Sequence, residues 1–360
     1  MSIKELYHKY QKYHRANAMR QSYHALYKRI FSLHPELAAK EKNENLWLEK
    51  WRHYDKHVSV SSYRIFSKFI GEDINIIPLE ICATQVEPVL TPYDYLEFYS
   101  DKNSLNLSLP HDCMPAVLMR NIGGKYMDED YNPLDINDFL AQTETTPLIL
   151  KPSRECSGRG VQVIDRKQGN YYTRTGELVS SIYLQQHYHK DFLMQKCVRQ
   201  HPFLEQFNPT SVNTIRIFTY RDIQGIVHPM RSILRIGGKG ANVDNAHSGG
   251  MFCGVSDDGT LGKYCCSFLA DRTPVFNGID FEHGKYVIPE FDKIKSFSAA
   301  VGRRIPFHDL IAMDIALDCD SEPKLLEINT GGFSAWLFQF TVGPCFGTFT
   351  DEIMERCTHL

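Results

Sequence analysis

Two apolar runs joined by a polar turn constrain this chain most, because each run carries polar groups that need partners. The runs are LIAMDIAL at 310–317 and KLLEIN at 324–329, and the turn DCDSEP between them predicts a pair of antiparallel strands. Asp314 stands inside the first run, where an unpaired carboxylate would be costly. Glu327 and Asn329 are two residues apart and therefore share one face of the second strand.

This strand pair predicts a magnesium site. If Asp314 lies opposite Glu327, two carboxylates and the amide of Asn329 converge. Mg²⁺ prefers such hard oxygen donors, together with waters and substrate phosphates. Gly331 and Gly332 follow and let the backbone pass close to whatever the metal holds. The alternative is an ordinary strand end with surface polar groups, and the carboxylate inside the apolar run counts against it.

A glycine-rich stretch, ILKPSRECSGRGVQV at 149–163, predicts a strand, a loop and a second strand. Lys151 precedes the loop, which contains Ser157, Gly158 and Gly160. This is not a Walker A loop, because GK[ST] is absent and no helix follows. The backbone N–H groups of such a hairpin can still cover phosphates, with the lysine as a point cation. The alternative is an ordinary tight turn.

A third stretch, FLMQKCV at 192–198, reads as an apolar strand that ends in a hinge. Gln195, Lys196 and Val198 can offer backbone groups to the edge of an adenine, and Glu205 can hold ribose hydroxyls. A plain connection from a strand to a helix explains the same residues equally well.

Two further strands are predicted at 211–221 and 228–238, and each carries an arginine in apolar company. Arg216 and Arg235 need anionic partners if they lie on an inner sheet face, and phosphate or a substrate carboxylate would serve. Surface salt bridges are the alternative for each arginine. The glycine-rich segment 237–250 is a candidate mobile substrate loop.

The first 70 residues differ from the rest in charge and in pattern. They hold 14 Lys and Arg against 6 Asp and Glu, whereas the whole chain has a net charge of −3. Tyrosines at helical spacing predict helices there, and Pro35 is expected to open a new one. The region can receive an anionic substrate, face a membrane surface, or dock on the acidic remainder. Residues 75–91, rich in Ile and Val and broken by prolines, predict short strands and turns.

Composition narrows the class of protein. Hydrophobic residues make up 42% and charged residues 23%, as in ordinary globular proteins. No apolar stretch is long enough to predict a membrane span, and the segment MSIKELYHKY has no apolar h-region, so a secretory signal is not expected. Ten cysteines without metal-binding spacing are read as free thiols of a reducing cytoplasm. Strands and helices mixed in this order favour an α+β nucleotide enzyme.

Taken together, these stretches resemble the ATP-grasp superfamily, and within it most closely the sugar-transfer-associated ATP-grasp family. The resemblance covers about residues 95 to 350 and rests on several segments. They are DKN at 101–103, LKPSRECSGRGV, QKCVRQHPFLEQFNPTSVNTIRIFTY, VDNAHSGG and MDIALDCDSEPKLLEIN. The resemblance implies an α+β ATP-grasp fold, in which two α+β sub-domains clamp ATP, preceded by a helical basic region. The expected boundaries are 1–90 for the helical region, 91–197 for the lid sub-domain and 198–360 for the core sub-domain with the metal site.

The resemblance also implies a role for each candidate residue. The phosphates of ATP would contact Lys102, Lys151 and the loop of Ser157, Gly158 and Gly160; adenine would meet Gln195, Lys196 and Val198; ribose would meet Glu205; Mg²⁺ would bind Asp314, Glu327 and Asn329. The catalytic arginines Arg216 and Arg235 would steady the γ-phosphate or an acyl phosphate. Many members of the superfamily have glutamate where this chain has Gln195, so the chain departs from the pattern at the expected adenine contact.

The implied function is an ADP-forming ligase that uses ATP and Mg²⁺ to join a small-molecule carboxylate to an amine or sugar acceptor through an acyl phosphate. Polysaccharide or cell-surface biosynthesis is the expected context. An ATP-dependent sugar or polyol kinase on the same fold, and a non-catalytic nucleotide-binding protein, remain alternatives. Nucleic acid is not an expected partner, and the sequence leaves the oligomeric state open.

Overall fold

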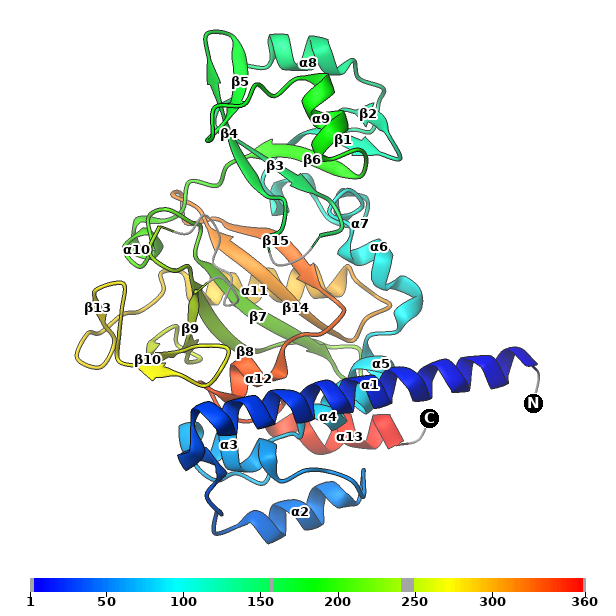
Figure 1. Ribbon diagram of the computed structural model, residues 1–360, viewed down its shortest axis with the longest axis vertical. Coiled ribbons are helices and arrows are strands. Elements are labelled where there is room, and N and C mark those ends of the chain that lie inside the picture. The colour runs from blue at the N-terminus through cyan, green and yellow to red at the C-terminus, as the bar shows by residue number, and fades with distance from the viewer. Residues whose placement is uncertain (1–2, 156–157, 241–248, 359–360) are drawn as a thin grey trace.

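Helices at the start of the chain and two antiparallel sheets after them organise the molecule (Figure 1). The computed structural model describes residues 3–155, 158–240 and 249–358. A six-stranded sheet lies at one end of the long axis, a seven-stranded sheet lies in the middle, and the first helices lie at the other end (Figure 1). The predicted mixture of helices and antiparallel strands is therefore present.

The N-terminal region is helical, as its tyrosine spacing predicts. Its longer helices are α1 (Ile3–Leu33), α2 (Glu44–Arg52) and α3 (Ser61–Ile70). Pro35 opens a new helix, as predicted, which is a short 3₁₀ helix, Pro35–Ala38. Short helices then lead toward the first sheet: α4 (Leu79–Ile81), α5 (Glu87–Leu90), α6 (Leu96–Ser100) and α7 (Leu105–Ser108).

The prediction of strands over 75–91 is wrong. A π-helical turn, Cys82–Val86, joins α4 to α5, so the segment is nearly continuous helix. Leu79, Val86 and Leu90 are buried at helical spacing, and packing of that stripe overrides the strand preference of the Ile and Val residues. Pro88 lies in α5, directly after this π-helical turn.

The six-stranded unit comprises residues 117–196. Its elements are β1 (Val117–Ile122), β2 (Lys125–Met127), α8 (Ile136–Gln142), β3 (Leu148–Pro152), β4 (Gln162–Lys167), β5 (Asn170–Thr173), α9 (Ser181–His187) and β6 (Phe192–Lys196). The strand order is β2-β1-β6-β3-β4-β5. The predicted strand, loop and strand around the glycine-rich stretch are β3 and β4, which pair with Leu148 opposite Ile164.

The seven-stranded unit comprises residues 202–358. Its strands are β7 (Thr214–Arg221), β8 (Val227–Ile236), β9 (Met251–Val255), β10 (Leu261–Cys266), β11 (Arg272–Thr273), β14 (Leu310–Leu317) and β15 (Pro323–Asn329), in the order β11-β10-β9-β8-β7-β14-β15. A small ribbon joins β12 (Val275–Phe276) to β13 (Ile279–Asp280). The helices are α10 (Pro202–Glu205), α11 (Phe291–Arg303), α12 (Ala335–Gln339) and α13 (Thr350–Thr358).

The two faces of the seven-stranded sheet are covered by different helices. Ile215 and Ile217 of β7 point to the core that contains α11, whereas Phe218 points to the core shared with α12, α13 and the N-terminal helices. Arg216 alternates with the isoleucines and therefore lies on the second face. The polar side chains of β7 and β14 thus lie on the same face of the sheet as α12.

The N-terminal helices belong to the same packed body as the seven-stranded unit. Trp47 and Trp51 are fully buried, and their indole N–H groups donate to the carbonyls of Ile76 and Ile74 at 2.7 and 2.9 Å. The side-chain oxygen of Gln339 in α12 accepts from the backbone N–H of Ile77 at 2.8 Å, and its side-chain nitrogen donates to the Ile77 carbonyl at 3.1 Å. Shared apolar packing, the hydrogen bonds from Gln339 and an ion pair of 2.8 Å between Lys50 and Asp351 attach the region.

No helix in the described ranges is long and apolar enough to cross a bilayer. All cysteines that the structure describes are free thiols.

Candidate active site

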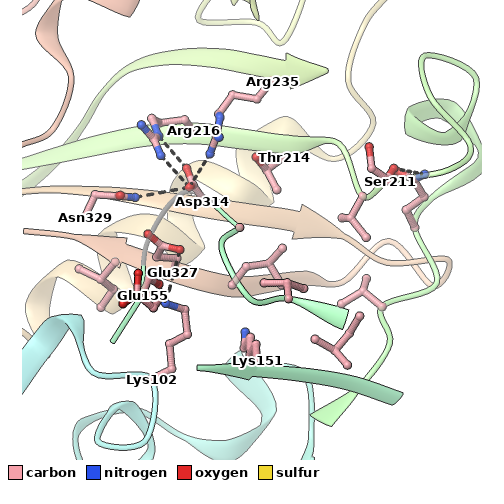
Figure 2. A pocket seen from close by; sticks show the side chains of 18 of the residues that line it. Lys102, Lys151, Glu155, Ser211, Thr214, Arg216, Arg235, Asp314, Glu327 and Asn329 are labelled. Carbon is pink, nitrogen blue, oxygen red and sulfur yellow. Dashed lines mark hydrogen bonds and ion pairs between the residues drawn. The ribbon is translucent and has the colours of Figure 1, made fainter. Parts of the chain in front are cut away.

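A cavity of about 930 Å³ lies between the two sheets. The six-stranded unit lines it with β3, the start of the following loop and the end of β6, and the seven-stranded unit lines it with β7, β8, β14 and β15 (Figure 2). It gathers these predicted residues: Lys102, Lys151, Gly158, Gln195, Val198, Glu205, Arg216, Arg235, Asp314, Glu327 and Asn329. Gly160 and Lys196 are not among its lining residues. Ser157, and residues 241–248 of the predicted substrate loop, lie outside the described residues.

The strand register explains how distant residues meet. Asp314 of β14 lies opposite Glu327 of β15, so the predicted pairing is confirmed. On its other side Asp314 lies opposite Arg216 of β7, and Thr214 of β7 lies opposite Arg235 of β8. Four neighbouring strands therefore bring their polar residues to one region of the sheet.

Asp314 is a buried carboxylate held by two arginines. Arg216 donates from Nε to Oδ1 and from a terminal nitrogen to Oδ2, both at 2.7 Å, and Arg235 donates to Oδ2 at 2.7 Å (Figure 2). Burial alone would raise the pKa of Asp314, but the two guanidinium groups outweigh it and hold that pKa well below its usual range. The carboxylate is therefore ionised, and its charge orients both arginines.

Glu327 is less strongly held. Its Oε2 lies 3.7 Å from Nζ of Lys102, and its side chain is 23% exposed. Asn329 lies beside both carboxylates, with 3.4 Å between its nitrogen and Oδ2 of Asp314. With the amide turned over, its nitrogen donates to Glu327 at 3.2 Å and its oxygen accepts from Arg216 at 3.3 Å, which satisfies both groups better.

Two lysines face these carboxylates from the six-stranded side (Figure 2). Lys102 donates from Nζ to the carbonyl of Glu155 at 2.9 Å, at the start of the glycine-rich loop. Burial, and to a lesser extent the nearby charge of Lys102, lower the pKa of Lys151 to about 7, although the charge of Glu327 acts in the opposite direction. The Lys151 ammonium therefore lies in a site that an anionic ligand would complete.

The glycine-rich loop folds back on its own strand. Gly160 has φ of +71°, and a Cβ there would lie 2.8 Å from Cγ of Pro152, so glycine is required. The hydroxyl of Tyr188 donates to the Gly160 carbonyl at 2.8 Å and fixes the far end of the loop. Gly160 thus shapes the loop, while Gly158 reaches the cavity lining.

The predicted hinge follows β6. Gln195 is buried and pairs with Ile149 of β3, and the exposed Lys196 donates its backbone N–H to Ala116 at 2.9 Å. Val198 and Glu205 line the cavity beyond this point, with Glu205 at the end of α10. The strand that leads into the hinge is therefore one wall of the cavity.

Sequence reasoning missed the α12 side of the cavity. Ser334, Trp336 and Leu337 line it, and the ring of Phe268 packs edge-on against Trp336 with 3.9 Å between ring centroids. The only signal in the sequence was their position directly after the INTGG segment.

The donor set fits a magnesium ion that also binds its substrate. Among the described residues no cluster of three His, Cys, Asp or Glu side chains forms a self-contained metal cage. Oδ1 of Asp314 accepts a single hydrogen bond, and Glu327 has the Asn329 amide at 3.2 Å and a lysine at 3.7 Å, so both carboxylates retain oxygen lone pairs. Mg²⁺ usually takes one or two carboxylates and completes its shell with phosphate and water oxygens. The residues present therefore fit such an ion.

Residues 122–353 match the family model described as sugar-transfer associated ATP-grasp. No curated protein matches the chain in sequence. One similar solved structure is the biotin carboxylase domain of a 2-oxoglutarate carboxylase from Hydrogenobacter thermophilus, in complex with MgADP, ADP and bicarbonate. It is 13% identical to this chain, with a TM-score of 0.37, and the match covers 65% of this chain and 40% of that chain. The VanG D-Ala:D-Ser ligase from Enterococcus faecalis is 12% identical with a TM-score of 0.42, over 72% and 62%. The ATP-grasp ligase PsnB, complexed with minimal precursor, is 11% identical with a TM-score of 0.41, over 88% and 76%. The chain spans less than half the length of the first three solved proteins that it matches.

Proposed function

The chain belongs to the sugar-transfer associated ATP-grasp family and has the ATP-grasp fold, and from this premise we propose that it is an ATP- and Mg²⁺-dependent ligase. It would join a small-molecule carboxylate to an amine or another nucleophile, with a sugar or amino acid as acceptor. One observation carries the proposal: two lysines of one sheet unit face a carboxylate pair of the other across a single cavity (Figure 2).

The proposed binding mode places ATP along this cavity. Adenine would lie at the hinge of Gln195, Lys196 and Val198, with ribose near Glu205. The six-stranded unit would act as a lid, and its lysines Lys102 and Lys151 would contact the phosphates together with the glycine-rich loop. The residues proposed to hold Mg²⁺ are Asp314, Glu327 and Asn329. When bound, Mg²⁺ would neutralise charge on the phosphates and orient them.

The proposed reaction has two displacements. A carboxylate oxygen of the substrate attacks the γ-phosphorus, the bond to the β-phosphate oxygen breaks, and ADP leaves. The acceptor nitrogen then attacks the acyl carbon, the bond to phosphate breaks, and a proton is released from the nitrogen. Arg216 and Arg235, oriented by Asp314, would steady the charge that spreads over the transferred group.

The described cavity lining carries an excess of positive charge. The basic residues there are Lys102, Lys151, Arg154, Arg174, Arg199, Arg216 and Arg235, and the acidic ones are Glu155, Glu205, Asp314 and Glu327. This excess suits an anionic nucleotide such as ATP. Because ATP alone accounts for it, the reaction products decide between the ligase and the kinase alternative.

An isotope-transfer experiment tests the proposal. The protein would be incubated with MgATP, a panel of ¹⁸O-labelled carboxylic acids, and a panel of amino sugars and amino acids. An acyl phosphate predicts that ¹⁸O moves from the carboxylate into released phosphate, with a new amide among the products. A stable phosphorylated sugar without free phosphate would establish the kinase alternative instead. ATP binding with no product from any pair would favour the non-catalytic alternative.

A further inference from the structure

Lys102 belongs to the six-stranded unit by its contacts, although it precedes that unit in the sequence. Its backbone N–H donates to the carbonyl of Ser153 at 3.0 Å, and its Nζ donates to that of Glu155 at 2.9 Å. The neighbouring Asp101 accepts from Nε of Arg154 at 2.8 Å. Backbone and side chain therefore bind this segment to the loop after β3.

Asn103, the next residue, makes three further hydrogen bonds. Its side-chain nitrogen donates to the carbonyl of Asn121 at 3.0 Å. Its own carbonyl accepts from the hydroxyl of Tyr131 at 2.7 Å and from Arg120 at 3.2 Å. All three partners belong to the six-stranded unit, so both the side chain and the backbone of Asn103 are fixed to that unit.

Arg120 is an unusual anchor. It is fully buried, its guanidinium lies 4.7 Å from the centroid of the Tyr131 ring, and it also donates to the side chain of Asn106. Neutral groups therefore replace the usual carboxylate partner. Its Nε and the side-chain oxygen of Asn103 have no hydrogen-bond partner in the described part of the chain. Unpaired buried polar atoms cost stability, so stability alone does not explain the arrangement.

The contrast with the other side of the cavity is clear. Within the described residues, segment 101–103 makes one polar contact with the seven-stranded unit, the 3.7 Å ion pair between Lys102 and Glu327. That pair is long, whereas the contacts to the six-stranded unit are hydrogen bonds of 2.7 to 3.2 Å that are buried or part-buried.

We propose that Asn103, Arg120 and Tyr131 are positioning residues that fix Lys102 to the six-stranded unit. Lys102 then moves with that unit when the cavity opens or closes, and its ion pair with Glu327 is the contact that breaks. For the role of Lys102 toward ATP, this inference rests on the proposed function. The attachment itself does not.

The test uses the full chain and variants that keep ring or charge. Tyr131→Phe removes the hydroxyl and keeps the ring beneath Arg120, and Arg120→Lys keeps the charge without the planar fork. Tyr172→Phe, on β5 of the same unit, is the matched control. The acetylation rate of Lys102 by an N-hydroxysuccinimide ester would be measured without nucleotide by peptide mass spectrometry, relative to the exposed Lys167.

Loss of one hydrogen bond of this kind predicts that Lys102 reacts about fivefold faster in Tyr131→Phe. We expect Arg120→Lys to do the same, and Tyr172→Phe to behave as wild type. Calorimetry should show that MgATP binds about fivefold more weakly to the first two variants, and both should unfold cooperatively at temperatures above that of the binding measurement. Wild-type rates at Lys102 in both variants would overturn the inference. If wild-type protein binds no ATP, the proposed function fails, and the acetylation rates still decide the attachment.

Discussion

Glu327 is compensated by cationic side chains much less than its neighbour Asp314. Asp314 has two arginines at 2.7 Å, whereas Glu327 has one lysine at 3.7 Å. A carboxylate left in this state is suited to a cation that arrives with the substrate.

Glu327→Gln keeps the shape of the side chain and removes its charge. If Glu327 binds Mg²⁺, we expect the fold to persist and ATP turnover to fall about a hundredfold, the cost of roughly 3 kcal/mol of transition-state stabilisation. Raising Mg²⁺ should restore part of the rate. Lys324→Gln, on the same strand, removes only an exposed bond to the Asp112 carbonyl and should behave as wild type. An unchanged rate and unchanged Mg²⁺ dependence in Glu327→Gln would contradict the metal assignment.

Lys151 gives the stability a defined pH dependence. Burial lowers its folded-state pKa to about 7, whereas an unfolded lysine titrates near 10.4. Between these values the unfolded chain holds a proton that the folded chain has released, so this group makes stability rise with pH. Urea unfolding at pH 7 and pH 9 should show a larger gain for wild type than for Lys151→Met. Equal gains would mean that Lys151 keeps an ordinary pKa in the folded protein.

At the scale of elements, α12 joins the cavity to the N-terminal helices. Its Trp336 and Leu337 line the cavity, and its Gln339 is buried against the backbone of Ile77. Helix α12 therefore contacts both the N-terminal region and the cavity, and connects the two.

Gln339→Ala should show the strength of this connection. It leaves the N–H and C=O of Ile77 buried without partners, which predicts a loss of about 2–3 kcal/mol in the free energy of unfolding. Gln206→Ala removes a comparable but exposed bond to the Phe203 carbonyl and should cost less than about 0.5 kcal/mol. Urea denaturation of both variants measures the difference. Equal and small losses would show that the two hydrogen bonds between Gln339 and Ile77 do not stabilise the attachment of the N-terminal helices.

The elements also differ in how well the sequence predicts them. β14 and β15 were predictable with their register, because Asp314 inside an apolar run demands partners and the polar turn sets the pairing. Residues 75–91 were not, since their Ile and Val content favours strands locally while the stripe that packs in the core is helical. In this segment, burial of the helical stripe outweighed the local strand preference of Ile and Val.

For the whole molecule, sequence patterns predicted the chemical groups of the site better than their supports. Lys102, Lys151 and Glu327 stand in recognisable short motifs, and the structure brings them to one cavity. The attachment of Asn103 to Arg120 and Tyr131 depends on contacts between separate segments, which no local pattern contains. The same holds for Trp336 and Phe268, which read as ordinary core aromatics until the fold places them beside the cavity.

The central claim is that MgATP binds between the two sheets, and titration calorimetry tests it most directly. ATP would be titrated into the full chain with and without Mg²⁺, and into Lys151→Gln with Lys324→Gln as the control. The account predicts binding of one ATP per chain that is at least about tenfold tighter with Mg²⁺, loss of that binding in Lys151→Gln, and wild-type behaviour in Lys324→Gln. Absence of binding by the wild-type chain, or equal affinity in Lys151→Gln, would contradict it.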